Sequence, residues 1–358
     1  MRPVGHEEET VALASLIESV LGTDLPIALR AYDGTVVGPS DAPATVILRT
    51  PNALRRIVTA PGELGFARAY VAGDLDVDGD MFAALELRDR LPDVKLTPKQ
   101  LVAAAREVGF RNLRPLPPPP EEARLHGRRH SVARDRAAVS HHYDVSNDFY
   151  RIILGPSLTY SCAVFTDDDT TLEQAQANKY ELVARKLGLH EGMRFLDVGC
   201  GWGGMVLHAA QHHGVRAVGV TVAARQVDLA SKRVAEAGFA DRAEIRNQDY
   251  RFIDDGPYDA ISSIGMFEHV GEAKLSEYFG RLYSLLRPGG RLLNHGISQP
   301  PGGKARFSRG GFIDHYIVGT VFPRGYDRIV QVAVAFLFVA VYGSLVLRRS
   351  RASTRKTG

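Results

Sequence analysis

The chain has 358 residues, of which 45% are hydrophobic and 24% charged, and its formal net charge is +3. These values are typical of a globular chain long enough for two domains, and the small net charge argues against a nucleic-acid partner. The two cysteines, Cys162 and Cys200, lie far apart and lack the spacing of metal ligands. Their placement predicts no bound metal and a reduced, cytoplasmic setting.

The first part of the chain predicts a small α+β unit. An amphipathic helix is expected over residues 10–22, and Asp33-Gly34 predicts a β-hairpin that joins strands at 25–30 and 35–37. The other expected elements are a strand at 44–49 and helices at 51–58, 81–91 and 98–108. This part of the sequence carries no recognisable catalytic constellation.

Residues 115–138 predict a linker, because the prolines at 115–120 favour an extended chain that joins neither a helix nor a central strand. One cluster of basic residues follows the prolines, and a second lies near the end of the sequence. Both suit anionic lipid head groups, and a solvated segment explains them equally well. They consist of Arg124, Arg128, Arg129, Arg134 and Arg136 with His126 and His130, and of Arg348, Arg349, Arg351, Arg355 and Lys356.

From residue 139 onward, strands and helices alternate with short connections, which predicts a parallel sheet covered on both faces. The expected strands are 194–198, 217–221, 243–247, 258–264 and 291–295. The expected helices are 172–187, 205–213, 223–237 and 273–286. The run Arg287-Pro288-Gly289-Gly290 is expected to form a turn before the last strand.

The most informative segment is 195–204, where a strand breaks into a glycine-rich turn that opens a helix. Gly199, Gly201 and Gly203 allow the backbone to turn tightly and to approach a ligand. The N–H groups at the start of the helix favour a carboxylate or a phosphate. The second strand ends at Thr221 instead of the acidic residue expected of a nicotinamide binder, which argues against a dehydrogenase.

Polar residues stand at every strand end of this domain, namely Asp197, Thr221, Asp249, Glu268 and His295. Because ligands of open α/β sheets lie beyond the carboxyl ends of the strands, we expect these residues to converge on one crevice. Structural explanations stay open for single residues. Glu268 could serve a helix N-terminus, His295 could be a structural histidine, Trp202 could brace the turn, and Tyr143 and Tyr150 could either bind lipid or pack a helix.

Several motifs occur in one order between residues 139 and 314. They are residues 141–150, Tyr160-Ser161-Cys162, the turn at 197–204, residues 219–222 with Gln226, Gln248-Asp249-Tyr250 and residues 265–271. Together they resemble the cyclopropane-fatty-acyl-phospholipid synthase family, which includes mycolic-acid cyclopropane synthases and other fatty-acid methyltransferases. The N-terminal unit is similar in size and position to the lipid-associated N-terminal region of that family.

The resemblance implies an organisation of the chain. Residues 1–114 would form a lipid-associated α+β domain, 115–138 the linker, 139–314 a Rossmann-like class I methyltransferase domain, and 315–358 an apolar segment with a basic tail. It also implies transfer of a methyl group from S-adenosylmethionine to a cis double bond of an unsaturated phospholipid acyl chain. Bound bicarbonate would deprotonate the resulting carbocation so that a cyclopropane ring closes in a dry pocket.

The resemblance also assigns site residues. Cys162, Glu268 and His295 match the positions that hold bicarbonate. The positions that match donor-binding residues are Tyr160, Ser161, Asp197, Gly199, Gly201, Thr221, Gln226, Asp249 and Tyr250. Three alternatives stay open: a methyl-branched or methylene product, a small-molecule methyltransferase, and an inactive lipid-binding relative.

The sequence departs from the family pattern after Asp314, where the last strands of the sheet and a tyrosine of the bicarbonate site are expected to lack counterparts. The apolar run at 329–347 is long enough to span a bilayer, and an interfacial segment, a span and a buried helix are the alternatives in order of preference. We expect a cytoplasmic protein that is peripheral on the inner face of the membrane. Its expected partners are membrane phospholipids, with a homodimer as an open alternative.

Overall fold

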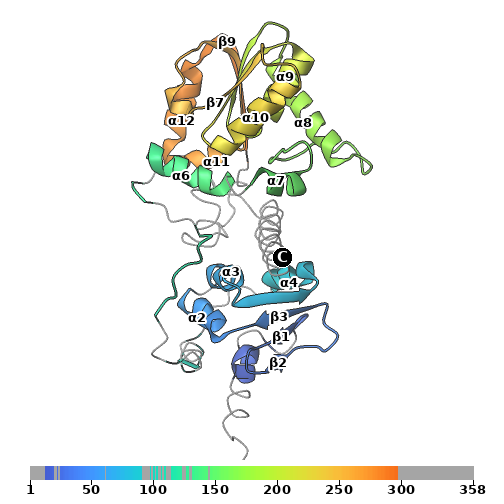
Figure 1. Cartoon of the computed structure of the whole chain (residues 1–358), viewed down its shortest axis with the longest axis vertical. Coiled ribbons are helices and arrows are strands. Elements are labelled where there is room, and N and C mark those ends of the chain that lie inside the picture. The colour runs from blue at the N-terminus through green and yellow to red at the C-terminus, as the bar shows by residue number, and fades with distance from the viewer. Residues whose placement is uncertain are drawn as a thin grey trace, which may run out of the picture. The chain divides into compact units, whose positions relative to one another are not determined.

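The computed structural model describes residues 13–19, 25–60, 62–90, 114–122, 126–128, 131–143 and 146–296, with single positions 22, 97, 100, 102, 103, 106 and 109 between them. The chain divides into two compact units on either side of Glu122 (Figure 1). Most of the helix expected at 98–108, all of 315–358 and the apolar run at 329–347 lie outside the described residues. None of the described helices is long and apolar enough to cross a bilayer.

The first unit contains a four-stranded sheet in the order β2-β1-β3-β4. Its strands are β1 (Ala28–Arg30), β2 (Val36–Val37), β3 (Ala44–Leu48) and β4 (Leu75–Gly79). The predicted hairpin is confirmed, since β1 and β2 pair antiparallel and Gly34 takes a φ of 92°. The Asp33 carboxylate stabilises this turn by accepting hydrogen bonds from the Thr35 amide at 2.9 Å and the Thr35 hydroxyl at 2.8 Å.

The helices of the first unit include two that were expected, α2 (Pro51–Thr59) and α4 (Met81–Arg90), and one that was not, α3 (Glu63–Val71). Glycines at positions 62 and 65 lower the helical signal of α3, yet Gly65 is where α3 packs closely on α2. A Cβ at Gly65 would lie only 2.7 Å from the Arg56 carbonyl oxygen. Tertiary packing therefore overrides the weak local propensity of this helix.

Residues 114–122 are held to the helices of the first unit, to which they belong. The Arg55 Nε donates to the carbonyl oxygen of Arg114 at 2.8 Å, and Arg56 donates to that of Pro117 at 2.9 Å. Glu122 is buried and accepts two hydrogen bonds from Arg68 of α3, at 2.6 and 2.7 Å. The proline run is thus fixed at several points, and the helix α6 (Val132–Tyr143) begins within the stretch that was expected to be a linker.

The second unit contains a five-stranded sheet in the order β7-β6-β5-β8-β9, and all its strand pairs are parallel. The strands are β5 (Arg194–Val198), β6 (Arg216–Thr221), β7 (Ala243–Asn247), β8 (Tyr258–Ile264) and β9 (Leu286–His295). Strand order reverses between β5 and β8, so the carboxyl end of β5 is the topological switch point at which doubly wound sheets bind ligands. This confirms the predicted fold class.

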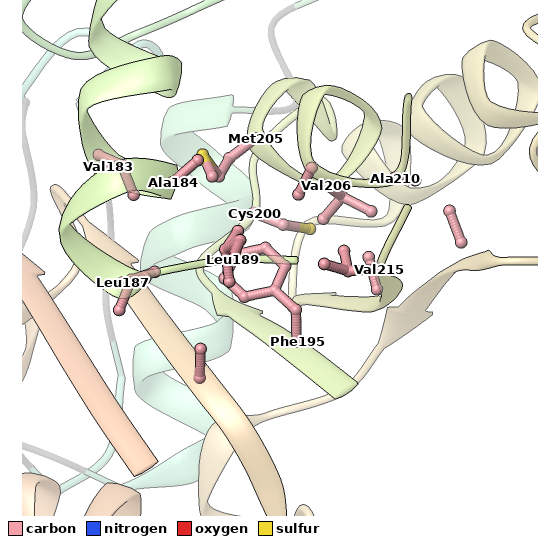
Figure 2. Packing of buried hydrophobic residues seen from close by; sticks show 14 of the residues in the cluster. Val183, Ala184, Leu187, Leu189, Phe195, Cys200, Met205, Val206, Ala210 and Val215 are labelled. Carbon is pink, nitrogen blue, oxygen red and sulfur yellow. The ribbon is translucent and has the colours of Figure 1, made fainter. Parts of the chain in front are cut away.

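Helices cover both faces of this sheet (Figure 1). They are α8 (Leu172–Leu187), α9 (Gly204–His213) and α10 (Ala224–Glu236) on one face and α12 (Leu275–Ser284) on the other. Alternate residues of β5 enter the two cores, Phe195 on the α8–α9 side and Leu196 on the α12 side. Figure 2 shows the Phe195 ring among side chains from α8 and α9, including Val183 and Val206.

The last described strand corrects one prediction. The expected turn at 287–290 is part of β9, which begins at Leu286. The register with β8 shifts between Tyr258 and Ala260, and Gly289 takes a φ of 78° there. Because β9 forms an edge of the described sheet, it tolerates Pro288 and such an irregularity, which a central strand would not.

Candidate active site

The glycine-rich turn connects β5 to α9 at the switch point of the sheet. Gly199, Gly201 and Gly203 take φ values of 78°, 55° and 77°, a region that favours glycine. Gly199 and Gly203 are packed against Met266 and Ala230, whereas no described atom outside its two chain neighbours lies within 4 Å of a Cβ built on Gly201. No described side chain caps α9, so its first N–H groups are available for an anionic ligand.

Asp197 lies at the end of β5, directly before this turn, and is 3% exposed. Its Oδ1 accepts a hydrogen bond of 2.5 Å from the Ser262 hydroxyl of the neighbouring strand β8. Burial raises the pKa of the Asp197 carboxyl to about 6, although the hydrogen bond and the attraction of Lys179 act in the opposite direction. The site therefore holds a carboxylate whose ionised form is costly in the absence of a ligand.

Further residues that were predicted to bind the methyl donor lie at or after the ends of β6 and β7. Thr221 ends β6, and its hydroxyl donates to the Gln226 side-chain oxygen at 2.8 Å, with both residues buried. Asp249 follows β7 and accepts hydrogen bonds from the Arg251 backbone at 3.0 Å and from its guanidinium at 2.9 and 2.7 Å. Tyr250 meets the ring of Tyr278 edge-on at 4.8 Å between centroids.

Glu268 and His295 come from adjacent strand ends. Glu268 lies on the short helix α11 (Phe267–Val270) after β8 and is 4% exposed. A Cβ built on Gly296 would lie 3.0 Å from Glu268 Oε1, and the Gly265 amide donates to the His295 carbonyl oxygen at 2.9 Å. Burial, with the charges of two lysines, lowers the pKa of His295, so its imidazole is neutral at physiological pH.

The segment that contains Tyr160, Ser161 and Cys162 is fastened to α8. Gln176 Nε2 donates to the Ser161 carbonyl oxygen, and Lys179 Nζ donates to the Ser161 hydroxyl, each at 2.9 Å. Cys162 is exposed beside this attachment. The attachment fixes the backbone of the segment while leaving the Cys162 thiol accessible.

Lys179 was missed by the sequence analysis. It is buried, and burial lowers its pKa to about 8 despite the opposing charges of Asp197 and Cys162. Its charge also helps to lower the pKa of His295. One buried lysine is therefore near four predicted site residues, which belong to three different segments. Its position four residues after buried Ala175 and four before buried Val183, on the inner face of α8, was the available signal.

An aromatic cluster lies beside the glycine turn, with Tyr143 of α6 at its centre. The ring centroid of Tyr143 lies 6.1 Å from that of Trp202, 6.2 Å from Tyr160 and 6.5 Å from His269. Its further neighbours are His142 at 4.6 Å and Tyr150 at 6.3 Å. Sequence reasoning left the role of Tyr143 open, and the structure assigns it a place among predicted site residues.

Two histidines of this cluster are electrically neutral. Burial lowers the pKa of His142 to about 3 and that of His269 to about 4. Tyr150 donates to the His142 carbonyl oxygen at 2.8 Å, and Trp202 donates to the Asn147 side-chain oxygen at 2.9 Å. The polar atoms of the Tyr150 and Trp202 side chains are thus bound by other protein groups. The cluster therefore offers uncharged aromatic surface, which attracts cations.

The strand order and the glycine turn at the switch point define a Rossmann-like domain whose ligand site lies beyond the carboxyl end of β5. Residues 130–336 match the family of mycolic acid cyclopropane synthetases, and the chain belongs to that family. The protein is accordingly an enzyme of the cyclopropane synthase and fatty acid methyltransferase type. The family match extends beyond the 139–314 range of the sequence motifs at both ends.

Several curated relatives are similar over most of the chain. A probable fatty acid methyltransferase of Mycobacterium tuberculosis is 45% identical over 88% of this chain and 75% of its own length. The cyclopropane-fatty-acyl-phospholipid synthase of Escherichia coli K12 is 34% identical over 79% of this chain and 67% of its own length. A crystal structure of a mycolic acid cyclopropane synthase with SAH and CTAB is 36% identical over 53% of this chain and 70% of that chain, with a TM-score of 0.49.

Proposed function

We propose that the protein transfers a methyl group from S-adenosylmethionine to a cis double bond in an unsaturated phospholipid acyl chain and closes a cyclopropane ring there. The observation that carries the proposal is the proximity of two kinds of group at one edge of the sheet. A carboxylate and a neutral imidazole, Glu268 and His295, lie on adjacent strand ends. An uncharged aromatic cluster joins that edge through His269, the residue next to Glu268.

The residues at the switch point fit the donor. The space at Gly201 and the uncapped start of α9 suit the carboxylate of its amino-acid part. The buried Thr221–Gln226 pair suits a ribose, since both side chains keep hydrogen-bonding capacity beyond their mutual contact. Asp249 retains acceptor capacity in addition to its three bonds with Arg251, and Tyr250 offers a ring face to an adenine. When bound, the donor supplies a methyl group made electrophilic by its sulfonium.

The aromatic cluster fits the acceptor chemistry. Addition of a methyl cation to an alkene leaves positive charge on the acyl chain, and water would quench that charge. Tyr143 and Trp202 present ring faces that stabilise a cation, while the neutral imidazoles of His142 and His269 add no repelling charge. The same surface attracts the sulfonium of the donor.

Ring closure requires removal of a proton from the methyl group. Glu268 and His295 are suited to hold bicarbonate, which would supply this base, and the backbone near Cys162 would complete its site. Glu268 would bind the protonated oxygen of the ion, and His295 would donate its N–H to a charged oxygen. Lys179 would favour an anion at this position through its charge, as it does for the carboxylate of Asp197.

A methyl-branched product is the second candidate. It rests on the similarity of this chain to proteins named as fatty acid methyltransferases, one of them the tuberculostearic acid methyltransferase of M. tuberculosis at 34% identity. A ring and an unsaturated methylene or methyl-branched chain arise from the same cation and differ in which proton leaves, whereas a saturated methyl-branched chain would also require a hydride donor. We place the substrate in the inner leaflet of the cytoplasmic membrane, where the donor and unsaturated phospholipids are both accessible.

The proposal is tested with vesicles of a cis-unsaturated phospholipid, S-adenosylmethionine, bicarbonate and the full chain. Mass spectrometry should find an acyl chain heavier by one CH₂, and upfield cyclopropyl protons in its NMR spectrum should distinguish a ring from a methylene or methyl-branched chain. Glu268→Gln should abolish the product, whereas Glu277→Gln on the exposed surface of α12 should not. A folded wild-type protein that binds the donor and yields no modified chain would refute the proposal.

A further inference from the structure

Three potential metal ligands meet between α8 and α9. Glu181 projects from α8, and His208 and His213 project from α9. Glu181 Oε2 lies 3.0 Å from His213 Nε2 and 3.5 Å from His208 Nε2. One ligand atom from each of the three residues lies within 4.8 Å of the other two. The proposed function uses none of these side chains.

We propose that Glu181, His208 and His213 form a binding site for a divalent transition metal of the zinc type that links α8 to α9. Ligand atoms about 2.0–2.2 Å from a tetrahedral zinc ion lie about 3.3 Å from one another. The two measured oxygen–nitrogen separations, 3.0 and 3.5 Å, lie on either side of this value. The side chains are therefore already near the positions that coordination requires.

Hydrogen bonds within the cluster do not satisfy the polar atoms of all three side chains. The His213 contact has the length of a hydrogen bond, whereas the buried His208 Nε2 lies 3.5 Å from the same Glu181 oxygen, longer than a well-formed hydrogen bond, and makes no other hydrogen bond among the described residues. An imidazole nitrogen that is withdrawn from water and directed toward a carboxylate costs free energy unless something binds it. A metal ion would bind this nitrogen and the carboxylate at the same time.

The chemical nature of the three ligands indicates which class of metal the site would bind. Two imidazoles and one carboxylate suit zinc and its neighbours among the first-row transition metals, whereas magnesium and calcium prefer sets of oxygen ligands. His208 and His213 are 12% and 17% exposed and Glu181 is 45% exposed, so the open side of the site faces solvent. Water can therefore occupy the fourth position.

A metal at this position would stabilise the frame of the active site. Glu181 lies two residues after Lys179, whose ammonium group binds Ser161, and His208 lies four residues after Gly204 at the end of the glycine turn. Tyr180 connects the same elements, since its hydroxyl hydrogen-bonds to Thr159 at 2.7 Å and its ring lies 5.7 Å from that of His208. Coordination would cross-link α8, which holds the segment with Ser161, to α9, which follows the glycine-rich turn.

The experiment uses the full chain, freed of metal by a chelator and titrated with ZnCl₂ against a chromophoric zinc indicator. The wild type should bind one zinc ion and gain thermal stability. Glu181→Gln and His213→Asn should each weaken binding at least tenfold and abolish the gain, whereas His190→Asn, at an exposed histidine in the loop after α8, should change neither. MgCl₂ should not raise the melting temperature.

Two results would overturn the site. One is a wild-type protein that takes up no zinc, and the other is a variant series in which all chains bind it equally. If a variant fails to fold, as judged by circular dichroism, Co²⁺ substitution of the wild type decides the question. A visible absorption spectrum of four-coordinate cobalt with nitrogen and oxygen ligands is expected, and a hexa-aqua spectrum would refute the proposal.

Discussion

Replacement of Asp197 by asparagine tests whether a buried charge in the candidate active site lowers the stability of the fold. The carboxylate is 3% exposed and receives one short hydrogen bond, from Ser262. Asparagine has nearly the same size, and its side-chain oxygen can still accept from Ser262. The substitution therefore removes the charge and leaves the packing of the strand end unchanged.

The size of the effect on the free energy of unfolding follows from the pKa of Asp197, which burial raises from 3.8 to about 6. Between these two values the folded protein keeps a proton that the unfolded chain has released, so the free energy of unfolding falls as pH rises through this window. At 1.36 kcal/mol per pKa unit, the ionised carboxylate costs about 3 kcal/mol above the window and almost nothing below it. The attraction of Lys179 is already included in this pKa.

The Asp197→Asn variant should therefore be more stable than the wild type by about 3 kcal/mol at pH 7.5 and by about 1.5 kcal/mol at pH 5. Urea unfolding followed by fluorescence at both pH values measures the difference. The single tryptophan, Trp202, is buried within the glycine turn and reports on the second unit alone. The variant should also bind S-adenosylmethionine more weakly, because a buried carboxylate that lowers the stability of the fold is expected to be present for its role in binding the donor.

Asp228→Asn is the matched control, because Asp228 lies on the exposed face of α10. It should change the free energy of unfolding by less than about 0.5 kcal/mol at both pH values. Equal stability of the Asp197→Asn variant and the wild type at pH 7.5 would refute the reasoning. A gain of the same size at both pH values would also refute it, since it would not arise from ionisation.

Three further predictions concern packing and positioning. Gly219→Ala should destabilise the second unit by about 1–3 kcal/mol in urea unfolding, because its Cβ would lie 2.7 Å from the Val206 side chain and 2.9 Å from that of Cys200. Gly280→Ala on the exposed surface of α12 should instead stabilise this unit by about 0.5–1 kcal/mol. Lys179→Met should leave folding intact and weaken donor binding in calorimetry by about tenfold, because the Ser161 hydroxyl loses its charged partner; unchanged affinity would exclude a positioning role. Glu122→Gln should lower the stability of the first unit by about 3 kcal/mol in thermal unfolding, because the buried Glu122 carboxylate and the partly buried Arg68 guanidinium lose their ion pair, and a loss below about 1 kcal/mol would contradict this.

The strands and helices of the second unit could be predicted from sequence because their signals are local. The bounds of β5, β7, β8 and α8 agree with the predicted ones. Apolar runs of strand length alternate with helical spacing there, and glycines mark the turns. The error at 287–290 has the same origin, since Pro-Gly-Gly normally signals a turn and only the edge position of β9 permits a strand.

The first unit was harder to read. The strand β4 (Leu75–Gly79) contains two aspartates and ends in glycine, so its sequence resembles a loop. The ion pairs of Asp76 with Arg49 and of Asp74 with Arg56 hold this region beside β3 and α2. These partners lie 27 and 18 residues away in the sequence, beyond the reach of a local pattern.

The sequence by itself determined the residues at the strand ends, because a parallel sheet places every carboxyl end at one edge. Asp197, Thr221 and His295 follow from that rule alone. Only the tertiary structure decided which residues of the covering helices face this edge and one another. Lys179 beside Ser161, Tyr143 among its aromatic neighbours, and Glu181 with its two histidines each depend on how one helix packs against another segment. Helical periodicity predicts that a residue faces inward, but the packing angle and the partner that it meets are properties of the whole fold.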